Sequence, residues 1–263
     1  MRLMLGILKP DSGEGRVGSC DLVHDPESIS TLTGYVSQRF SLYGELTVRE
    51  NLELFADLYH VSAHERAPRL QRLMQFSRLE PFRDRLGRDL SGGMKQKLAL
   101  SCALIHTPKL LLLDEPTTGV DPLSRRDLWR LLFELWQEGV TIIVSTPYMD
   151  EAERCSRVGF LNQGRLIATG RPEDLRSRFK GTILEVYADQ RFAAKDVLAR
   201  LPHVASVNIF GEGLHVTLDV ADPAAAAEHM QRGLESHGLA VRSWRQMEPT
   251  IEDVFFQLSG TEK

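Results

Sequence analysis

The stretch that decides the fold is Leu110-Leu111-Leu112-Leu113-Asp114-Glu115-Pro116. Its apolar run is bounded by Pro108 and Asp114, and a short run of this kind favours a strand buried on both faces. Ligands of α/β proteins bind at the carboxyl ends of such strands. Asp114 could hold Mg²⁺, often through water, and Glu115 could orient or deprotonate an attacking water. An acidic turn between a strand and a loop is the plainer interpretation, and this stretch alone leaves both open.

The residues that follow predict a helix and a second strand. Asp121-Pro122 is typical of an N-cap followed by proline at the first helical position. The buried face of the helix is predicted from four leucines: Leu128, Leu131, Leu132 and Leu135. Gly139 should end the helix, and residues 140–144 read as a second buried strand. These lengths predict a parallel sheet with right-handed crossovers.

A second chemical signal lies upstream, in Leu90-Ser91-Gly92-Gly93-Met94-Lys95-Gln96. A serine and two glycines come directly before a helix that should run to about His106. Backbone N–H groups at a helix start are unpaired, and the helix dipole makes that end positive. Glycines let a phosphate approach the backbone closely, and the hydroxyl of Ser91 can add a donor. A plain capped helix start is the alternative.

Residues 1–8 have the apolar density of a buried helix, which Pro10 and Gly13 should end. Residues 14–37 read as short strands and turns. Helical patterns then extend over residues 47–106, opened by a capping box at Thr47-Val48-Arg49-Glu50. This region is the predicted helical subdomain.

Composition excludes some classes of protein. The chain has 263 residues and a formal net charge of −4, whereas nucleic-acid binders are usually basic. Cys20, Cys102 and Cys155 are too far apart for a metal spacing and fit a reducing compartment. The apolar runs fall far short of the roughly 20 residues that cross a bilayer. A membrane role would therefore require a partner.

After Gly170 the sequence no longer predicts a parallel sheet and instead predicts a second, smaller domain. Strands are predicted at residues 182–188, 204–210, 213–219 and 239–247, with helices at 193–201 and 223–236. This βαββαβ order suggests a small ferredoxin-like domain. Thr250-Ile251-Glu252-Asp253 should cap a final helix through Leu258. The predicted domains are residues 1–178 and residues 181–263.

Taken together, these motifs resemble the ATP-binding subunit of ABC transporters. Residues 91–96 resemble the signature motif, and residues 110–115 resemble a Walker B strand with its catalytic glutamate. Residues 118–121 resemble the D-loop, and Gln38 resembles the Q-loop glutamine. The motifs occur in the family's order and cover nearly the whole chain. The terminal domain, which closes with residues 249–255, resembles the C-terminal extension of daunorubicin-resistance-type exporter ATPases.

The resemblance implies a P-loop NTPase-like α/β fold and a head-to-tail dimer with two ATP molecules at its interface. It implies that Asp114 and Gln38 bind Mg²⁺, and that Glu115 and Gln38 act on the attacking water. A third set of residues would contact the ATP held by the opposite subunit or work across the interface: Ser91, Gly92, Gly93 and Asp121. Residues 39–46 would lie near a coupling helix of the membrane permease. The protein would then be cytoplasmic, held at the inner face of the cell membrane by the permease.

The sequence departs from the family in its phosphate-binding loop. No Gly-x-x-x-x-Gly-Lys-Ser/Thr occurs, although in the family this loop precedes a helix that resembles residues 1–8. The loop would cradle the phosphates, and its lysine would neutralise their charge. We expect a chain that is truncated before or within this Walker A motif and that lacks the first strand. A miscalled start, a gene remnant or a split protein could each explain that.

A second departure is Pro147, which stands where the family has a switch histidine. Histidine would hydrogen-bond the γ-phosphate, and proline cannot donate. We expect Thr146 to cap a helix with Pro147 at its first position. A variant with near-normal hydrolysis and a degenerate site that is slow at hydrolysis are both open, and we favour the second.

Three functions compete. The leading one is an ATP-hydrolysing subunit of a multidrug-exporter-like transporter. A non-hydrolysing half-site, which supplies Ser91-Gly92-Gly93 in trans to a partner's ATPase, is the alternative. A soluble ABC ATPase of DNA repair or translation is less consistent with the terminal domain and with the absence of a coiled-coil insertion.

Overall fold

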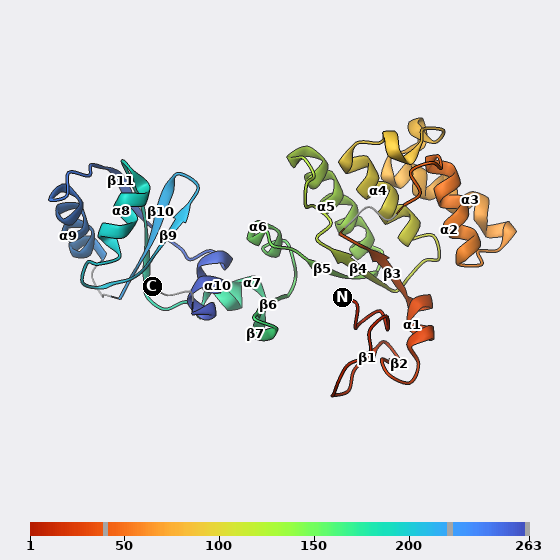
Figure 1. The fold of residues 1–263 in the computed structure, drawn as a ribbon, viewed down its shortest axis with the longest axis horizontal. Coiled ribbons are helices and arrows are strands. Elements are labelled where there is room, and N and C mark those ends of the chain that lie inside the picture. The colour runs from red at the N-terminus through yellow and green to blue at the C-terminus, as the bar shows by residue number, and fades with distance from the viewer. Residues whose placement is uncertain (39–41, 220–222, 261–263) are drawn as a thin grey trace. The chain divides into compact units, whose positions relative to one another are not determined.

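The computed structural model describes residues 1–38, 42–219 and 223–260 (Figure 1). The chain divides into two compact units, Met1–Pro147 and Tyr148–Lys263, which are described separately below. The expected domain boundary between residues 178 and 181 remains a prediction. Over the described residues, none of the helices combines the length and the apolar character needed to cross a bilayer.

A three-stranded parallel sheet forms the centre of the first unit. Its order is β3 (Thr33–Val36), β4 (Leu110–Asp114) and β5 (Thr141–Ser145), which confirms the predicted parallel arrangement. The three central leucines of β4 are at most 1% exposed, as expected for a strand with a neighbour on each side. Asp114 and Ser145 are partners in register, so their side chains meet at the same edge of the sheet.

The predicted burial of the second strand was wrong. Thr141 and Ile143 of β5 are exposed, with Ile143 at 37%, and the other residues are only partly buried. Among the described residues, β5 is hydrogen-bonded to β4 alone. A β-branched apolar run predicts a strand, but whether both of its edges are covered depends on neighbours that the run does not encode.

Two helices pack on the sheet, α4 (Gly92–Ala103) and α5 (Pro122–Gln137). The four leucines predicted for the inner face of α5 are its buried residues. Asp121 is the N-cap of α5, and its carboxylate accepts the Ser124 N–H at 2.9 Å, as predicted. The helix ends just before Gly139, whose φ of 92° lies in the left-handed region.

A helical subdomain lies between β3 and β4 in the chain. In addition to α4, it contains α2 (Val48–Leu58), α3 (Ala63–Ser77) and the 3₁₀ turns η1 (Glu80–Phe82) and η2 (Gly87–Asp89). The predicted capping box is confirmed: the Glu50 N–H donates to Thr47 Oγ1 at 3.2 Å, and the Thr47 N–H donates to Glu50 Oε2 at 2.8 Å. Both orphan donors at the start of α2 are thereby satisfied.

Residues 1–8 do not form the predicted buried helix. They form turns, and Ile7 is 63% exposed. Gly6 has a φ of 68°, which no right-handed helix contains. An apolar run this short cannot hold a helix unless it packs against a neighbour, because helix nucleation is unfavourable.

Residues 14–37 combine short strands with an unpredicted helix. β1 (Arg16–Val17) pairs with β2 (Cys20–Asp21), and α1 (Pro26–Leu32) follows. Pro26 stands at the start of α1, where a missing N–H costs nothing.

The second unit contains the predicted βαββαβ order. The elements are β8 (Thr182–Ala188), α8 (Arg191–Leu198), β9 (Val204–Phe210), β10 (Gly213–Leu218), α9 (Pro223–Glu235) and β11 (Val241–Met247). The strands form an antiparallel sheet in the order β11-β8-β10-β9. One sheet face packs against α8 and α9 around Leu184, Val216 and Leu234.

The rest of this unit is a smaller cluster around a hairpin. It consists of α6 (Met149–Ala152), β6 (Val158–Asn162), β7 (Arg165–Gly170), α7 (Pro172–Arg176) and the final helix α10 (Ile251–Ser259). Ile251 and Val254 of α10 are buried with Phe160 and Leu175. Thr250 and Asp253 form the predicted capping box of α10.

A buried polar pair connects the four-stranded sheet to α10. His215 of β10 and Asp253 are 5% and 3% exposed, and His215 Nδ1 lies 2.9 Å from Asp253 Oδ1. The other carboxylate oxygen of Asp253 accepts the N–H and hydroxyl of Thr250 at 2.8 and 2.6 Å. Phe210 stacks on the imidazole, with ring centroids 3.9 Å apart. Asp253 therefore holds the helix start and the sheet together.

We expect Asp253→Asn to lower the free energy of unfolding by about 1–3 kcal/mol at neutral pH, because hydrogen bonds to a charged acceptor are lost. Burial by itself raises the pKa of Asp253, but the hydrogen bonds from His215 and Thr250 outweigh burial and hold the pKa below its usual 3.8. A depressed folded pKa means that this stabilisation is complete above the unfolded pKa and is lost as pH falls through the folded value.

Thermal denaturation between pH 7 and pH 3 would test this. Below about pH 4 the wild-type chain should lose stability more steeply than Asp253→Asn. The exposed Glu228→Gln of α9 is the control. Parallel curves for wild type and Asp253→Asn would contradict the expectation.

Candidate functional site

Asp114 lies at the carboxyl end of β4, between side chains of both neighbouring strands. The Ser145 hydroxyl donates to Asp114 Oδ1 at 2.5 Å, and the Tyr35 hydroxyl donates to Asp114 Oδ2 at 3.4 Å. All three residues are partly buried. Burial and the negative charge of Asp114 raise the pKa of Tyr35, so its phenol remains protonated and able to donate. The carboxylate is thus held in one orientation.

Glu115 has a strained backbone and a defined side chain. Its φ of 47° lies in the left-handed region, where a residue with a Cβ is uncommon and is often part of a functional site. Its side-chain Oε2 accepts Gln38 Nε2 at 2.8 Å and Thr118 Oγ1 at 3.1 Å. Gln38 and Glu115, 77 positions apart in the chain, therefore meet beside Asp114.

The remaining predicted residues gather where α4 and α5 begin. Ser91 is the N-cap of α4, and its Oγ accepts the Met94 N–H at 3.3 Å. A Cβ on Gly93 would lie 2.3 Å from Ser124 Oγ, and a Cβ on Gly92 would lie 3.7 Å from the Gly119 carbonyl. Only glycine at position 93 lets the signature-like helix start approach α5 this closely.

Asp121 caps α5 beside this helix start. Hydrogen bonds from Ser124 lower its pKa, so it is ionised at neutral pH. One turn further along the helices, Lys97 of α4 and Asp127 of α5 form an ion pair of 3.0 Å. The described contacts thus place the predicted residues in two groups: Gln38, Asp114 and Glu115 in one, and Ser91, Gly92, Gly93 and Asp121 in the other.

The first group fits Mg²⁺ bound together with a phosphate ligand. Magnesium typically takes one or two carboxylates and fills its remaining positions with water and substrate phosphates. Asp114 offers a carboxylate, and Gln38 offers an amide oxygen. Across the residues that the structure describes, no three His, Cys, Asp or Glu side chains gather as a self-sufficient metal cage. Asp114 and Gln38 could supply two ligands of such a metal.

Neither group was predicted to contain Ser145, Tyr35 or Ser124. The signal that could have found Ser145 is strand alignment, since the ends of parallel strands lie at one sheet edge. Residues 39–41, the start of the predicted permease-facing segment, lie outside the described residues.

The local prediction for Pro147 was wrong. The following helix α6 begins at Met149, with Tyr148 as its N-cap, so Pro147 is not the first helical residue and Thr146 is not the cap. Tyr148 is extended, with φ −93° and ψ 112°. Proline also disfavours a helical conformation of the residue before it, which keeps Thr146 out of the helix.

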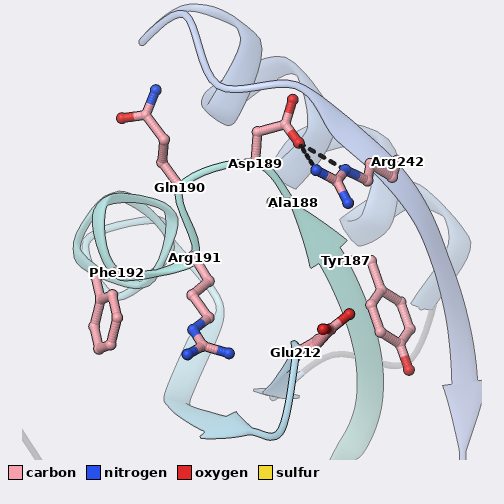
Figure 2. Close-up of a pocket in the computed structure, with 8 residues that line it drawn as sticks. All are labelled: Tyr187, Ala188, Asp189, Gln190, Arg191, Phe192, Glu212 and Arg242. Atoms are coloured by element: carbon pink, nitrogen blue, oxygen red, sulfur yellow. Dashed lines mark hydrogen bonds and ion pairs between the residues drawn. The ribbon is translucent and has the colours of Figure 1, made fainter.

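A hollow of about 370 Å³ lies on the second unit, around the β8–α8 turn (Figure 2). Figure 2 shows Arg242 directed at Asp189, and Arg242 Nη2 lies 2.6 Å from Asp189 Oδ1. Arg191 donates to the carbonyl of Gly211. None of the residues that the sequence predicts to contact ATP or Mg²⁺ lines this hollow.

Two family models match the chain. The model described as ABC transporter matches residues 1–118. The model described as ATP-binding protein DrrA1-3-like, C-terminal domain, matches residues 170–259.

Curated relatives match over essentially the whole chain. The probable multidrug ABC transporter ATP-binding protein YbhF of Escherichia coli K12 is 39% identical over 263 residues, covering 99% of this chain. This chain spans only 44% of YbhF. The Nod factor export ATP-binding protein I of Cupriavidus metallidurans is 34% identical, with 100% of this chain and 84% of that protein covered.

Solved structures of ATP-binding proteins also align with this chain. The ATP-binding subunit of an ABC transporter aligns with a TM-score of 0.61 and 34% identity, covering 68% of this chain and 75% of the other. The ATP-binding cassette MJ0796, solved as a dimer bound to ADP and Pi, aligns with a TM-score of 0.58 and 27% identity. That alignment covers 65% of this chain and 78% of MJ0796.

Proposed function

Because this chain belongs to the ATP-binding proteins of ABC transporters, we propose that it is the ATP-hydrolysing subunit of a multidrug-exporter-like transporter. The resemblance seen in its motifs is thereby confirmed at the level of the family. The single observation that carries the proposal is the contact of Gln38 with Glu115 beside Asp114. Phosphoryl transfer to water uses a residue that holds the metal and a residue that orients the attacking water.

The first group of residues would act on the phosphates and the water. Asp114 and the amide oxygen of Gln38 would hold Mg²⁺, which when bound neutralises charge on the β- and γ-phosphates. Glu115 would orient the attacking water and accept its proton. Gln38 and Thr118 both donate to the Glu115 carboxylate and would hold it in position as the base.

The second group would serve the ATP of another subunit. Ser91 accepts a backbone N–H with its oxygen, which leaves its hydroxyl hydrogen available to donate to a phosphate. Gly92 is exposed and leaves the N-terminal end of α4 open to close approach, and the backbone N–H of Gly93 would donate to the phosphate there. Asp121 would work across the dimer interface. MJ0796 was solved as a dimer with ADP and Pi, which supports a dimer here.

The proposed partners are a second ABC ATPase subunit or domain and a transmembrane permease. The name of the Nod factor export protein supports an export role, and the name of YbhF supports a multidrug transporter. A cytoplasmic site at the membrane, held by the permease, is proposed from membership of the ABC family. The decisive test is Glu115→Gln in the transporter assembled with its permease: hydrolysis should stop while ATP still binds. A normal hydrolysis rate would overturn the proposal.

Pro147 favours the alternative of a degenerate site that hydrolyses slowly or serves only as a half-site. We expect Pro147→His to raise the hydrolysis rate of the assembled transporter by about tenfold or more, since one donor to transition-state charge is worth on the order of 10²–10³ at its largest. Phosphate release at saturating ATP would measure this. Pro147→Ala, which removes the ring without adding a donor, is the control. An unchanged rate in Pro147→His would show that position 147 does not limit hydrolysis.

A further inference from the structure

Ser145 has a position that the family motifs do not explain. It ends β5, and its register partner is Asp114 at the end of β4. Its hydroxyl donates to Asp114 Oδ1 at 2.5 Å, and the same oxygen accepts the backbone N–H of Glu115 at 3.1 Å. A hydroxyl has one donor and two acceptor positions, so it can make both bonds at once.

The Glu115 backbone depends on this residue for its conformation. The Glu115 N–H also donates to the Ser145 carbonyl, at 3.0 Å. One residue on β5 thus supplies both acceptors of this N–H, at a position whose φ of 47° is unfavourable for glutamate. Surrounding contacts must offset such strain if the conformation is to persist.

Tyr35 supports Asp114 from β3, the strand that flanks β4 on the side opposite to β5. Its hydroxyl reaches Oδ2 at 3.4 Å, a longer and weaker contact than that of Ser145. Asp114 is therefore bracketed by hydroxyls from β3 and β5, the two strands that flank β4.

We propose that Ser145, assisted by Tyr35, is a positioning residue that aims Asp114 at Mg²⁺ and holds the Glu115 backbone in its strained conformation. The inference rests on the proposed ATPase function for its catalytic meaning, whereas the hydrogen bonds that Ser145 and Tyr35 make are a property of the chain alone. Partners that orient metal-binding groups typically change metal affinity or activity by 10–100-fold when they are removed.

Amide hydrogen exchange of Glu115, followed by NMR on the labelled chain, tests the contact between Ser145 and the Glu115 N–H without nucleotide. In Ser145→Ala the Glu115 N–H keeps only the carbonyl acceptor, and we expect it to exchange about tenfold faster, the change that corresponds to one net hydrogen bond. Ser145→Thr keeps the hydroxyl and should restore slow exchange. Thr141→Val, at the exposed start of the same strand, is the matched control. Unchanged exchange in Ser145→Ala would overturn the inference.

The catalytic consequence is read in the transporter assembled with its permease. Ser145→Ala should need about tenfold more Mg²⁺ for half-maximal hydrolysis and should have a lower kcat, with the KM for ATP at saturating Mg²⁺ unchanged. Tyr35→Phe should shift the Mg²⁺ requirement in the same direction by a smaller factor. Faster Glu115 exchange with an unaltered Mg²⁺ requirement would reduce Ser145 to a structural role and overturn the proposal. If Glu115→Gln leaves hydrolysis intact, the ATPase assignment fails. The exchange result still shows whether Ser145 holds the Glu115 backbone.

Discussion

Glu115→Gln should reduce ATP hydrolysis by roughly 10³-fold in the assembled transporter and leave ATP binding nearly unchanged. General-base catalysis contributes about 10²–10⁴-fold, and an amide cannot accept the proton of the attacking water. The substituted side chain has the same shape. Its carbonyl oxygen can still accept Gln38 Nε2 and Thr118 Oγ1, which donate to Glu115 Oε2 at 2.8 and 3.1 Å. The change therefore removes the base and retains its surroundings.

Two measurements separate chemistry from binding. Phosphate release should fall, while equilibrium binding of ATP should stay within about twofold of wild type. Glu134→Gln, an exposed carboxylate of α5, is the matched control and should leave hydrolysis unaffected. Wild-type hydrolysis in Glu115→Gln would mean that the partner's site does the chemistry, which is the half-site alternative.

The parts of the fold that the sequence predicted are those where a local pattern and tertiary burial agree. The four leucines of α5 follow helical spacing, and the parallel sheet buries the same face. The apolar run of residues 1–8 lacks such agreement, because Gly6 breaks it and Ile7 remains exposed. Apolar density by itself does not make a helix, since most helix stability comes from packing.

The site was predictable only in part. Asp114 and Glu115 could be found from one strand end, and Gln38 from its resemblance to a motif. The hydroxyl of Ser145 could not, because its role depends on the register between β4 and β5. That register arises from tertiary pairing and has no counterpart in a local motif. The helix start after Pro147 was also missed, since a proline fits several positions near a helix N-terminus.

Asn51 is a further residue that sequence patterns do not reveal, and it organises the loop before α2. It is fully buried on α2. Its Nδ2 donates to the carbonyls of Tyr43, Leu46 and Thr47 at 3.0, 3.2 and 2.9 Å. Its Oδ1 accepts the Tyr43 N–H at 3.1 Å. One side chain thus fixes residues 43–47, of which residues 43–46 belong to the segment that the family resemblance places near the permease.

We expect Asn51→Ala to lower the free energy of unfolding by about 3–5 kcal/mol, because several buried hydrogen bonds and the packing of the amide are lost together. Asn51→Asp should be at least as damaging, since its second oxygen cannot donate and would face the carbonyl oxygens of Tyr43, Leu46 and Thr47. Urea denaturation and limited proteolysis within residues 43–47 would measure the global and the local effect. Glu53→Ala, exposed on the same helix, is the control and should stay within about 0.5 kcal/mol of wild type. If Asn51→Ala also stayed within that range, the amide would not be what holds the loop. Backbone bonds, such as those from the Gly87 N–H to the Leu46 carbonyl at 2.8 Å and from the Arg88 N–H to the Gly44 carbonyl at 3.0 Å, would then have to order it.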